Sequence, residues 1–303
     1  MRPLSSATFP LEVEWNLTWA CNAACHFCST AQYDLASIDT QWKTSIEEIR
    51  KCRPLFVTLT GGEPLLHPSF SMIVDALLSN GHKINITTNG RLIEKRITPQ
   101  QLGRINWIRV SLHAGEQSTA TSIFGAAYCL DEVRRGVIYA RSHTNRISGF
   151  TVITQENCSS AAIGKIFEFA HSLGLRQLDF GVMKLLGNAR ASQLPSRASL
   201  SQAMDFIREY SAYYAMQCSL PVLEERLHSC TSVSYSLSIM PDHTVGDCTF
   251  AGDDSIGSID VEGLEAIWSR HRNRTLTCNK CAEGGYFLDH RPAKGVIPIQ
   301  LTR

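Results

Sequence analysis

The sequence predicts an α/β fold over its first two-thirds and a smaller α+β module after about residue 218. Short strand-like runs alternate with helix-like runs six times before that point, and a hairpin and one short helix then replace the alternation. Strand–helix repetition is typical of parallel strands joined by right-handed helical crossovers. A chain of 303 residues can form one large domain or two ordinary ones. We predict two domains, residues 1–218 and 219–303.

The strand-like runs are rich in Ile, Val and Leu, as in a sheet that is covered on at least one face. They lie at residues 11–19, 55–60, 83–88, 107–113, 147–154 and 176–183. Six such units form either an open sheet or an incomplete barrel. In both architectures the chemistry is expected at the C-terminal ends of the strands.

Helix-like runs separate most of these strands, at residues 44–52, 68–81, 130–142, 160–174 and 199–216. In the first of them Ser45 stands three residues before Glu48, which predicts a capping box at the helix start. Beyond the boundary, residues 235–248 predict a hairpin that turns at Pro241 and Asp242. Residues 262–272 predict a short amphipathic helix.

The bulk composition excludes several classes of protein. The formal net charge is +1 and no basic block stands out, so neither a nucleic acid nor an acidic membrane is expected as a partner. No apolar run is long enough to span a membrane, and the N-terminal residues lack the apolar core of a signal peptide. We therefore expect a reducing cytoplasm, where the 11 cysteines favour metal or catalytic roles over disulfides.

Three cysteines, Cys21, Cys25 and Cys28, follow the first predicted strand directly. Cysteine is the expected ligand of iron–sulfur clusters, which normally take four thiolates. Three thiolates leave one iron free to bind another molecule. The alternative is a structural zinc site with His26 as the fourth ligand. The spacing favours the open cluster.

Polar side chains and glycines mark the ends of the next three strands. "TGGEP" follows the second strand and ends in Glu63 and Pro64, "TTNG" closes the third, and "SLHAG" closes the fourth with Ser111 and His113. Adjacent glycines allow a ligand to approach the backbone closely, and Glu63 supplies a carboxylate for an ammonium group. Because the ends of parallel strands share one edge of the sheet, these features predict a single site.

Taken together, these motifs resemble those of the radical S-adenosylmethionine (radical SAM) enzymes. The resemblance rests on Cys21-x3-Cys25-x2-Cys28, on Phe27 before the last cysteine and on "GGEP" after the second strand, and it covers roughly residues 11–190. It implies a partial (β/α)6 TIM-like barrel.

The resemblance also implies the cofactors. Cys21, Cys25 and Cys28 would hold a 4Fe–4S cluster whose open iron chelates the amino and carboxylate groups of S-adenosylmethionine. Reductive cleavage then yields a 5′-deoxyadenosyl radical that abstracts hydrogen from a substrate carbon. An external one-electron donor such as flavodoxin or ferredoxin is implied. The implied cofactor-binding residues are Phe27 near the adenine, Gly61, Gly62, Glu63, Pro64 and Asn89 toward the amino end, and Ser111 at the ribose or carboxylate.

One segment departs from the family pattern. Relatives often carry an arginine after the fourth strand that binds the methionine carboxylate, whereas "STATSIFGAAYC" has none. Arg109, Arg134 or another group must bind the methionine carboxylate instead.

The C-terminal region carries a second cysteine set, Cys230, Cys248, Cys278 and Cys281. Four thiolates can bind zinc or a complete 4Fe–4S cluster. Residues 219–290 resemble the twitch or SPASM extension of radical SAM enzymes, which implies one auxiliary 4Fe–4S cluster that exchanges an electron with the substrate radical. A purely structural site is the alternative.

Three further residues near the strand ends are candidates for catalysis. Cys158 follows the fifth strand, and its thiol is a candidate hydrogen donor for an epimerisation. His113 and Glu156 are candidates for substrate binding or proton transfer, and a structural role is equally open for each.

The predicted function is radical oxidation or epimerisation of a small biosynthetic intermediate of the aminocyclitol or sugar type. A ribosomally made peptide is the second candidate substrate. A non-catalytic iron–sulfur or zinc protein, acting as a sensor or scaffold, is the alternative from another class, and the intact "GGEP" and open cysteine triplet argue against it. The oligomeric state is left open.

Overall fold

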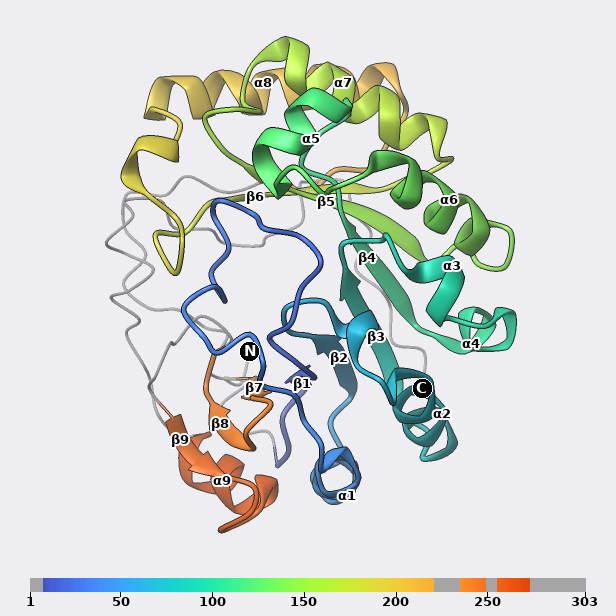
Figure 1. The fold of residues 1–303 in the computed structure, drawn as a ribbon, viewed down its shortest axis with the longest axis vertical. Coiled ribbons are helices and arrows are strands. Elements are labelled where there is room, and N and C mark those ends of the chain that lie inside the picture. Colours follow the sequence, from blue (N-terminus) through green and yellow to red (C-terminus); the bar gives the residue numbers. More distant parts are fainter. Residues whose placement is uncertain (1–7, 221–234, 249–254, 273–303) are drawn as a thin grey trace.

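The computed structural model describes residues 8–220, 235–248 and 255–272 (Figure 1). The described strands form one nine-stranded sheet in the order β6-β5-β4-β3-β2-β1-β7-β8-β9. The parallel strands are β1 Glu12–Asn16, β2 Phe56–Thr60, β3 Lys83–Thr88, β4 Trp107–Ser111, β5 Ile147–Ile153, β6 Leu178–Val182 and β7 Ser236–Ile239. The antiparallel strands β8 Thr244–Gly246 and β9 Ser255–Ser258 complete the sheet.

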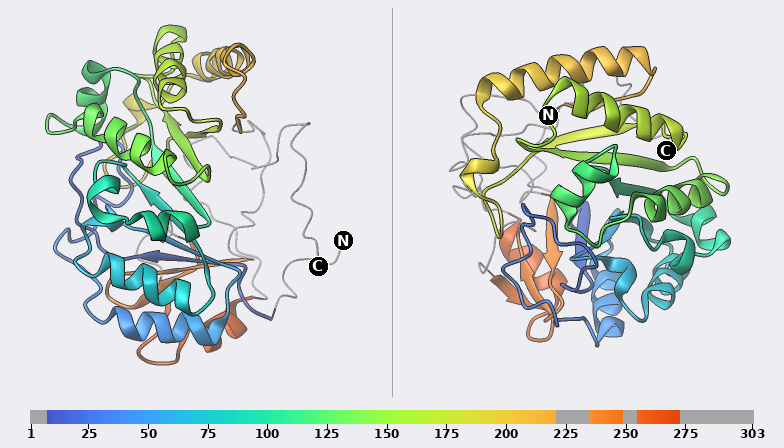
Figure 2. Two further views of the ribbon diagram at one scale, coloured as in Figure 1. Left: turned by 90° about the vertical axis from the view of Figure 1, so that its right-hand side faces the viewer. Right: turned by 45° about the horizontal axis from the view of Figure 1, so that its top comes forward.

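The helices lie along the outer side of the curved sheet, as Figures 1 and 2 show. They are α1 Trp42–Cys52, α2 Phe70–Ser79, α3 Ile93–Arg96, α4 Pro99–Arg104, α5 Gln117–Phe124, α6 Leu130–Arg141, α7 Ser160–Ser172, α8 Arg197–Tyr213 and α9 Leu264–His271. Every parallel connection from β1 to β6 passes through at least one of them, so the first part of the chain is a partial barrel of six strand–helix units.

The core lies between the helices and the facing side of the sheet. Along the inner strands every second side chain is completely buried there, namely Val13, Trp15, Val57, Leu59, Ile84, Ile86, Ile108 and Val110. The intervening side chains point to the opposite side of the sheet, because successive residues of a strand face opposite ways. We call the side chains of Glu12, Glu14, Thr58, Asn85, Arg109, Ser111 and Phe150 the open face.

The six predicted strands and the mixed α/β class are confirmed, as are the predicted hairpin and the helix after it. The capping box at Ser45 is wrong. The helix begins three residues earlier, at Trp42, and the Ser45 hydroxyl donates to Asp39 Oδ2 at 2.7 Å. A capping box does form between Thr98 and Gln101, at the start of α4.

The region after residue 218 adds strands to the same sheet. β7 pairs in parallel with β1, and the backbone N–H of Leu264 at the start of α9 donates to Glu48 on α1 at 3.1 Å. The proposed division into residues 1–218 and 219–303 therefore stays a prediction about folding units, while the sheet itself runs across it. None of the described helices combines the length and hydrophobicity needed to cross a bilayer.

A buried ion-pair network joins this C-terminal hairpin to the first part of the chain. His243, in the β7–β8 turn, is 2% exposed and lies between Asp260 (Nδ1 to Oδ1, 2.7 Å) and Asp39 (Nε2 to Oδ1, 3.0 Å). Asp39 is completely buried and also accepts from Trp15 Nε1 at 3.1 Å. Burial alone would lower the pKa of His243, but its bonds and attractions to the two carboxylates outweigh burial and raise it.

His243→Gln removes this cation and leaves Asp39 buried without it. Losing one partner of a buried ion pair costs about 3 kcal/mol of unfolding free energy. In the wild type the charge stabilises fully below about pH 6.5, and this stabilisation is lost as pH rises through the raised folded pKa. Denaturant melts at several pH values should show that the unfolding free energy of the wild type falls as pH rises through this range, whereas that of the variant does not. The exposed His143→Gln is the control. If the unfolding free energy of His243→Gln falls with pH as in the wild type, His243 is not the charged group responsible.

Candidate active site

The segment between β1 and α1, residues 17–41, lies at the C-terminal ends of the strands and carries Cys21, Cys25 and Cys28. We call it the cysteine loop. Its first half is bound to the end of β2 through backbone groups. Gly62 N–H donates to Thr18 O at 2.7 Å, and Glu63 N–H donates to Ala20 O at 2.8 Å.

Two glycines make this approach possible. A Cβ at Gly61 would lie 2.3 Å from Thr18 O, and one at Gly62 would lie 2.4 Å from Ala20 O. Gly61 also has φ +128°, which side chains rarely adopt. In this structure the two glycines therefore serve to seat the cysteine loop against the sheet. Their predicted contact with a bound cofactor stays a prediction.

The second half of the cysteine loop is held from two other sides. Ala24 N–H and His26 N–H donate to the carbonyls of Phe124 and Ile123 at the end of α5, at 2.7 and 3.1 Å. These bonds occupy carbonyls that a helix C-terminus leaves without partners. Beyond β6, Asn188 N–H donates to Cys28 O at 3.0 Å. The loop is thus fixed mainly by its backbone, and of its thiols Cys28 Sγ lies 3.2 Å from Thr30 Oγ1.

The three thiols fit an iron–sulfur cluster. Cys21 is exposed and Cys25 and Cys28 are partly buried. Burial raises the pKa of the Cys25 thiol, and the neighbouring thiols of Cys28 and Cys21 add to the rise. Three thiolates this close together need a positive group between them, which iron supplies on binding.

The zinc alternative requires His26 as the fourth ligand beside the three cysteines. Among the described residues no three His, Cys, Asp or Glu side chains are arranged to hold a single metal ion. Within this described part of the chain, His26 Nε2 is buried without a hydrogen-bond partner and lies 3.6 Å from Glu156 Oε2. A single zinc ion would require sulfur ligands about 2.3 Å from one centre, whereas a four-iron cluster spreads its ligands over separate iron atoms.

Glu63 places a buried carboxylate beside the cysteine loop. It is 1% exposed and accepts three hydrogen bonds, from Leu65 N–H (3.1 Å), Thr88 Oγ1 (2.7 Å) and Asn89 N–H (2.7 Å). Burial raises the pKa of Glu63 to about 7, although these donors oppose the rise. Pro64 follows as the first residue of a short 3₁₀ turn, Pro64–Leu66. A carboxylate that is only partly ionised at neutral pH is stabilised in its charged form when a cation binds beside it.

Asn89 links the end of β3 to the cysteine loop. Its Nδ2 donates to Asn22 Oδ1 at 2.6 Å and lies 4.0 Å from Cys21 Sγ. Arg91, which sequence reasoning missed, donates to Asn22 O and pairs with Glu132 at 2.5 Å. The only sequence signal for Arg91 was its place directly after "TTNG". These contacts make the β3 end a second support of the loop.

His113 is part of an aromatic stack behind Phe27. The ring centroids of Phe27 and His113 are 5.1 Å apart, and those of His113 and Phe124 are 5.0 Å apart in parallel planes. Burial lowers the pKa of His113 to about 3, and its Nδ1 accepts from Val152 N–H at 3.1 Å. The ring is therefore neutral and holds Phe27 in place, which favours the structural alternative for His113.

The other predicted residues lie around this centre. Ser111 ends β4 on the open face, paired in register with Phe150. Glu156 is exposed beside His26. Cys158 is 8% exposed within the hydrophobic core, with Sγ 3.5 Å from Gln155 O, and its part as a hydrogen donor stays a prediction.

Of the four predicted auxiliary cysteines, the described residues include one. Cys248 is partly buried just beyond β8. Cys230, Cys278 and Cys281 lie outside the described residues. Whether these four cysteines hold a second cluster therefore stays a prediction.

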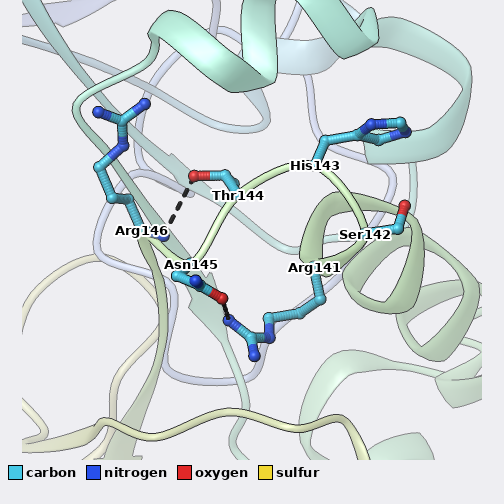
Figure 3. A pocket seen from close by; sticks show the side chains of 6 residues that line it. All are labelled: Arg141, Ser142, His143, Thr144, Asn145 and Arg146. Carbon is cyan, nitrogen blue, oxygen red and sulfur yellow. Dashed lines mark hydrogen bonds between the residues drawn. The ribbon is translucent and has the colours of Figure 1, made fainter.

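A shallow pocket at the opposite edge of the sheet is separate from this site. It has a volume of about 440 Å³ and is lined by residues 141–146, in the turn before β5 (Figure 3). Arg141 donates to Asn145 Oδ1 at 2.5 Å across it. Because it precedes the N-terminal end of β5, it lies away from the strand ends that carry the cysteines.

Residues 15–159 match the family model of the radical SAM superfamily, and the matched segment includes the cysteine loop, Glu63, Asn89 and the aromatic stack. The chain contains a radical SAM domain. Members of this family bind S-adenosylmethionine and a 4Fe–4S cluster, which agrees with the donor set of the cysteine loop. In this domain, Arg134 points away from the strand ends, with its guanidinium 4.9 Å from the Phe169 ring on α7.

Individual relatives share parts of this domain. The mycofactocin maturase MftC of Mycobacterium tuberculosis is 34% identical over 99 residues, which is 32% of this chain and 24% of the maturase. The chain thus matches about a quarter of the length of that relative. The S-adenosylmethionine-dependent nucleotide dehydratase of Selenomonas ruminantium is 27% identical over 215 residues, 66% of this chain and 76% of the dehydratase.

A solved structure shares the fold over most of the chain. Streptococcus suis SuiB bound to precursor peptide SuiA superposes with a TM-score of 0.70, covering 93% of this chain and 75% of SuiB at 16% identity. This likeness confirms the partial barrel with added C-terminal strands. At so low an identity it concerns the fold alone.

Gly62→Ala should displace the cysteine loop, because the new methyl group would overlap two backbone carbonyls. We expect about 1–3 kcal/mol lower unfolding free energy and a clear loss of bound iron after anaerobic reconstitution. Iron per chain and thermal melts measure both effects. The matched control is Gly103→Ala on α4, where a Cβ meets nothing within 4 Å. Normal iron binding by Gly62→Ala would show that the glycine does not position the loop.

Proposed function

We propose that the chain is a radical SAM enzyme that abstracts a hydrogen atom from an unactivated carbon of its substrate. The observation that carries this proposal is one loop with three ligand thiols, fixed by its backbone beside the buried carboxylate of Glu63. A 4Fe–4S cluster on Cys21, Cys25 and Cys28, together with S-adenosylmethionine, would supply the reductively formed 5′-deoxyadenosyl radical.

The chain's own residues position the cofactor in this proposal. Glu63 accepts a hydrogen bond from the methionine amino group, since its carboxylate is buried and, among the described residues, has no cationic partner in direct contact. Phe27, held by His113, lies against the adenine. Ser111 at the end of β4 reaches the ribose or carboxylate. Gly61, Gly62, Pro64 and Asn89 hold these groups at one edge of the sheet.

For the substrate we propose a peptide. Two observations support a peptide over the small biosynthetic intermediate expected from sequence. The 34% identical relative is a mycofactocin maturase, and the SuiB structure, which shares the fold over 93% of this chain, holds a precursor peptide. A small molecule remains the second candidate, supported by the nucleotide dehydratase aligned over 76% of its length.

For the reaction type we propose oxidation or epimerisation assisted by one auxiliary 4Fe–4S cluster on Cys230, Cys248, Cys278 and Cys281. Oxidation needs an electron acceptor, which such a cluster supplies. Epimerisation needs a hydrogen donor, and Cys158 is the candidate near the end of β5. A cytoplasmic flavodoxin or ferredoxin would provide the starting electron.

The first test is iron and sulfide per chain after anaerobic reconstitution, with 5′-deoxyadenosine formation under dithionite. Two 4Fe–4S clusters predict about eight iron in the wild type and about four in Cys21/Cys25/Cys28→Ala, which should form no 5′-deoxyadenosine. Cys52→Ala, a buried cysteine on α1, is the control and should keep both properties.

Other iron counts point to different proteins. About four iron in the wild type and none in the triple variant would leave only the first cluster and contradict the auxiliary one. A wild type that binds no iron, or that binds iron without cleaving S-adenosylmethionine, would favour a sensor or scaffold over an enzyme.

The Glu63 assignment predicts a pH dependence of cofactor binding. Because the free carboxyl has a pKa of about 7, its charged form is gained as pH rises, and affinity for the cationic ligand should rise between about pH 6 and pH 8. Glu63→Gln should bind S-adenosylmethionine about tenfold more weakly and without this rise. Equilibrium dialysis on the reconstituted protein measures both. The half-exposed Glu47→Gln on α1 is the control, and the same rise of affinity with pH in Glu63→Gln would show that Glu63 does not bind the methionine amino group.

A further inference from the structure

The open face of the sheet carries two opposite charges directly below the strand ends. Glu14 on β1 alternates with the core residues Val13 and Trp15, and Arg109 on β4 alternates with Ile108 and Val110. Both side chains therefore point away from the helices, toward the inside of the partial barrel.

Glu14 is a half-buried carboxylate without a direct partner. Within the part of the chain that the structure describes, it makes no hydrogen bond or ion pair, whereas its neighbour Glu12 accepts from Thr58 Oγ1 at 2.5 Å. Burial and the charge of Glu12 raise the pKa of Glu14 to about 7, and Lys184 and Arg109 oppose the rise. A carboxylate in this state is stabilised by a cation that a ligand brings.

Arg109 is exposed and has an aromatic support instead of a carboxylate. Its guanidinium carbon lies 5.5 Å from the centre of the Phe150 ring on β5. The guanidinium lies over the ring and is stabilised by a cation–π contact. Among the described residues no carboxylate pairs with it, so the planar fork of N–H groups can bind a carboxylate in two-point fashion.

The strand register places both charges beneath the cysteine loop. Arg109 pairs with Thr87 on β3 and stands two residues before Ser111, which is about 7 Å along the strand. Glu14 stands two residues before Asn16, the last residue before the cysteine loop. A ligand on these side chains would sit one layer below the level at which the radical is generated.

We propose that Glu14 and Arg109 form the floor of the substrate site and bind a peptide segment with a basic and an acidic side chain close together. Arg109 binds the acidic side chain and Glu14 the basic one. This inference rests on the proposed function and adds the substrate's charge pattern to it. Lying below Ser111, Arg109 is assigned to the substrate and not to the methionine carboxylate.

The test uses two capped dipeptides, N-acetyl-Lys-Glu-amide and the uncharged N-acetyl-Gln-Gln-amide. Ligand-observed NMR titrations of the reconstituted full chain with S-adenosylmethionine give the affinities. The charged dipeptide should bind about tenfold more tightly than the uncharged one, and Arg109→Gln or Glu14→Gln should each remove about that factor. The control is Arg134→Gln, whose guanidinium also lies over a phenylalanine ring, 4.9 Å away, but between α6 and α7.

A charge reversal guards against a variant that has only lost its fold. Glu14→Lys should gain affinity for N-acetyl-Glu-Glu-amide over the wild type, since two cations then face two carboxylates. Equal binding of charged and uncharged dipeptides by the wild type would overturn the proposal. So would an Arg109→Gln variant that binds S-adenosylmethionine more weakly while its dipeptide affinity stays unchanged, because Arg109 would then belong to the cofactor.

These binding measurements do not depend on turnover. A wild type that forms 5′-deoxyadenosine but does not distinguish the dipeptides would refute the charge pair and leave the proposed enzyme intact. A wild type that selects the charged dipeptide but never cleaves S-adenosylmethionine would uphold the charge pair and refute the proposed enzyme.

Discussion

The contact between the end of β2 and the cysteine loop is the constraint on which the site depends. The backbone N–H groups of Gly62 and Glu63 donate to the loop carbonyls of Thr18 and Ala20. A Cβ at Gly61 or Gly62 would overlap the loop backbone, so only glycine allows this close contact. The same short turn aims the Glu63 carboxylate at the end of β3, where Thr88 and Asn89 bind it. The position of the thiols and the position of the carboxylate are therefore set by one piece of backbone, so neither can shift without the other.

Asp39 fixes the other end of the cysteine loop. Its carboxylate accepts from Trp15 on β1 and Ser45 on α1 and pairs with His243, while its carbonyl lies 2.9 Å from His67 Nε2. The loop is thus attached to the sheet at both ends. The C-terminal strands take part in this attachment through His243, which gives them a structural part in the site whether or not the auxiliary cysteines bind a cluster.

The features that were predicted correctly from the sequence are those set by residues close together in the chain. The strands β1–β6 were found because each is a short apolar run, and the cluster ligands because their spacing lies within one loop. The Asp39–His243 pair spans 204 residues, and the neutral state of His113 depends on rings from two other segments, so no window of sequence contains either. Ser45 failed as a cap for a local reason, because the helix already begins at Trp42 and the Ser45 hydroxyl donates to Asp39, six residues earlier in the chain.

The alternation within the strands carried more information than their hydrophobicity. A parallel sheet covered by helices on both faces reads as continuous apolar runs, but β1 reads Glu-Val-Glu-Trp-Asn and β4 reads Trp-Ile-Arg-Val-Ser. Such strands cannot be buried on both sides, because Glu14 and Arg109 would then lie uncompensated in an apolar core. The sequence therefore requires one face of the sheet to stay polar and accessible. That face lies beneath the cysteine loop, where a substrate must be placed for a radical formed at the strand ends to reach it.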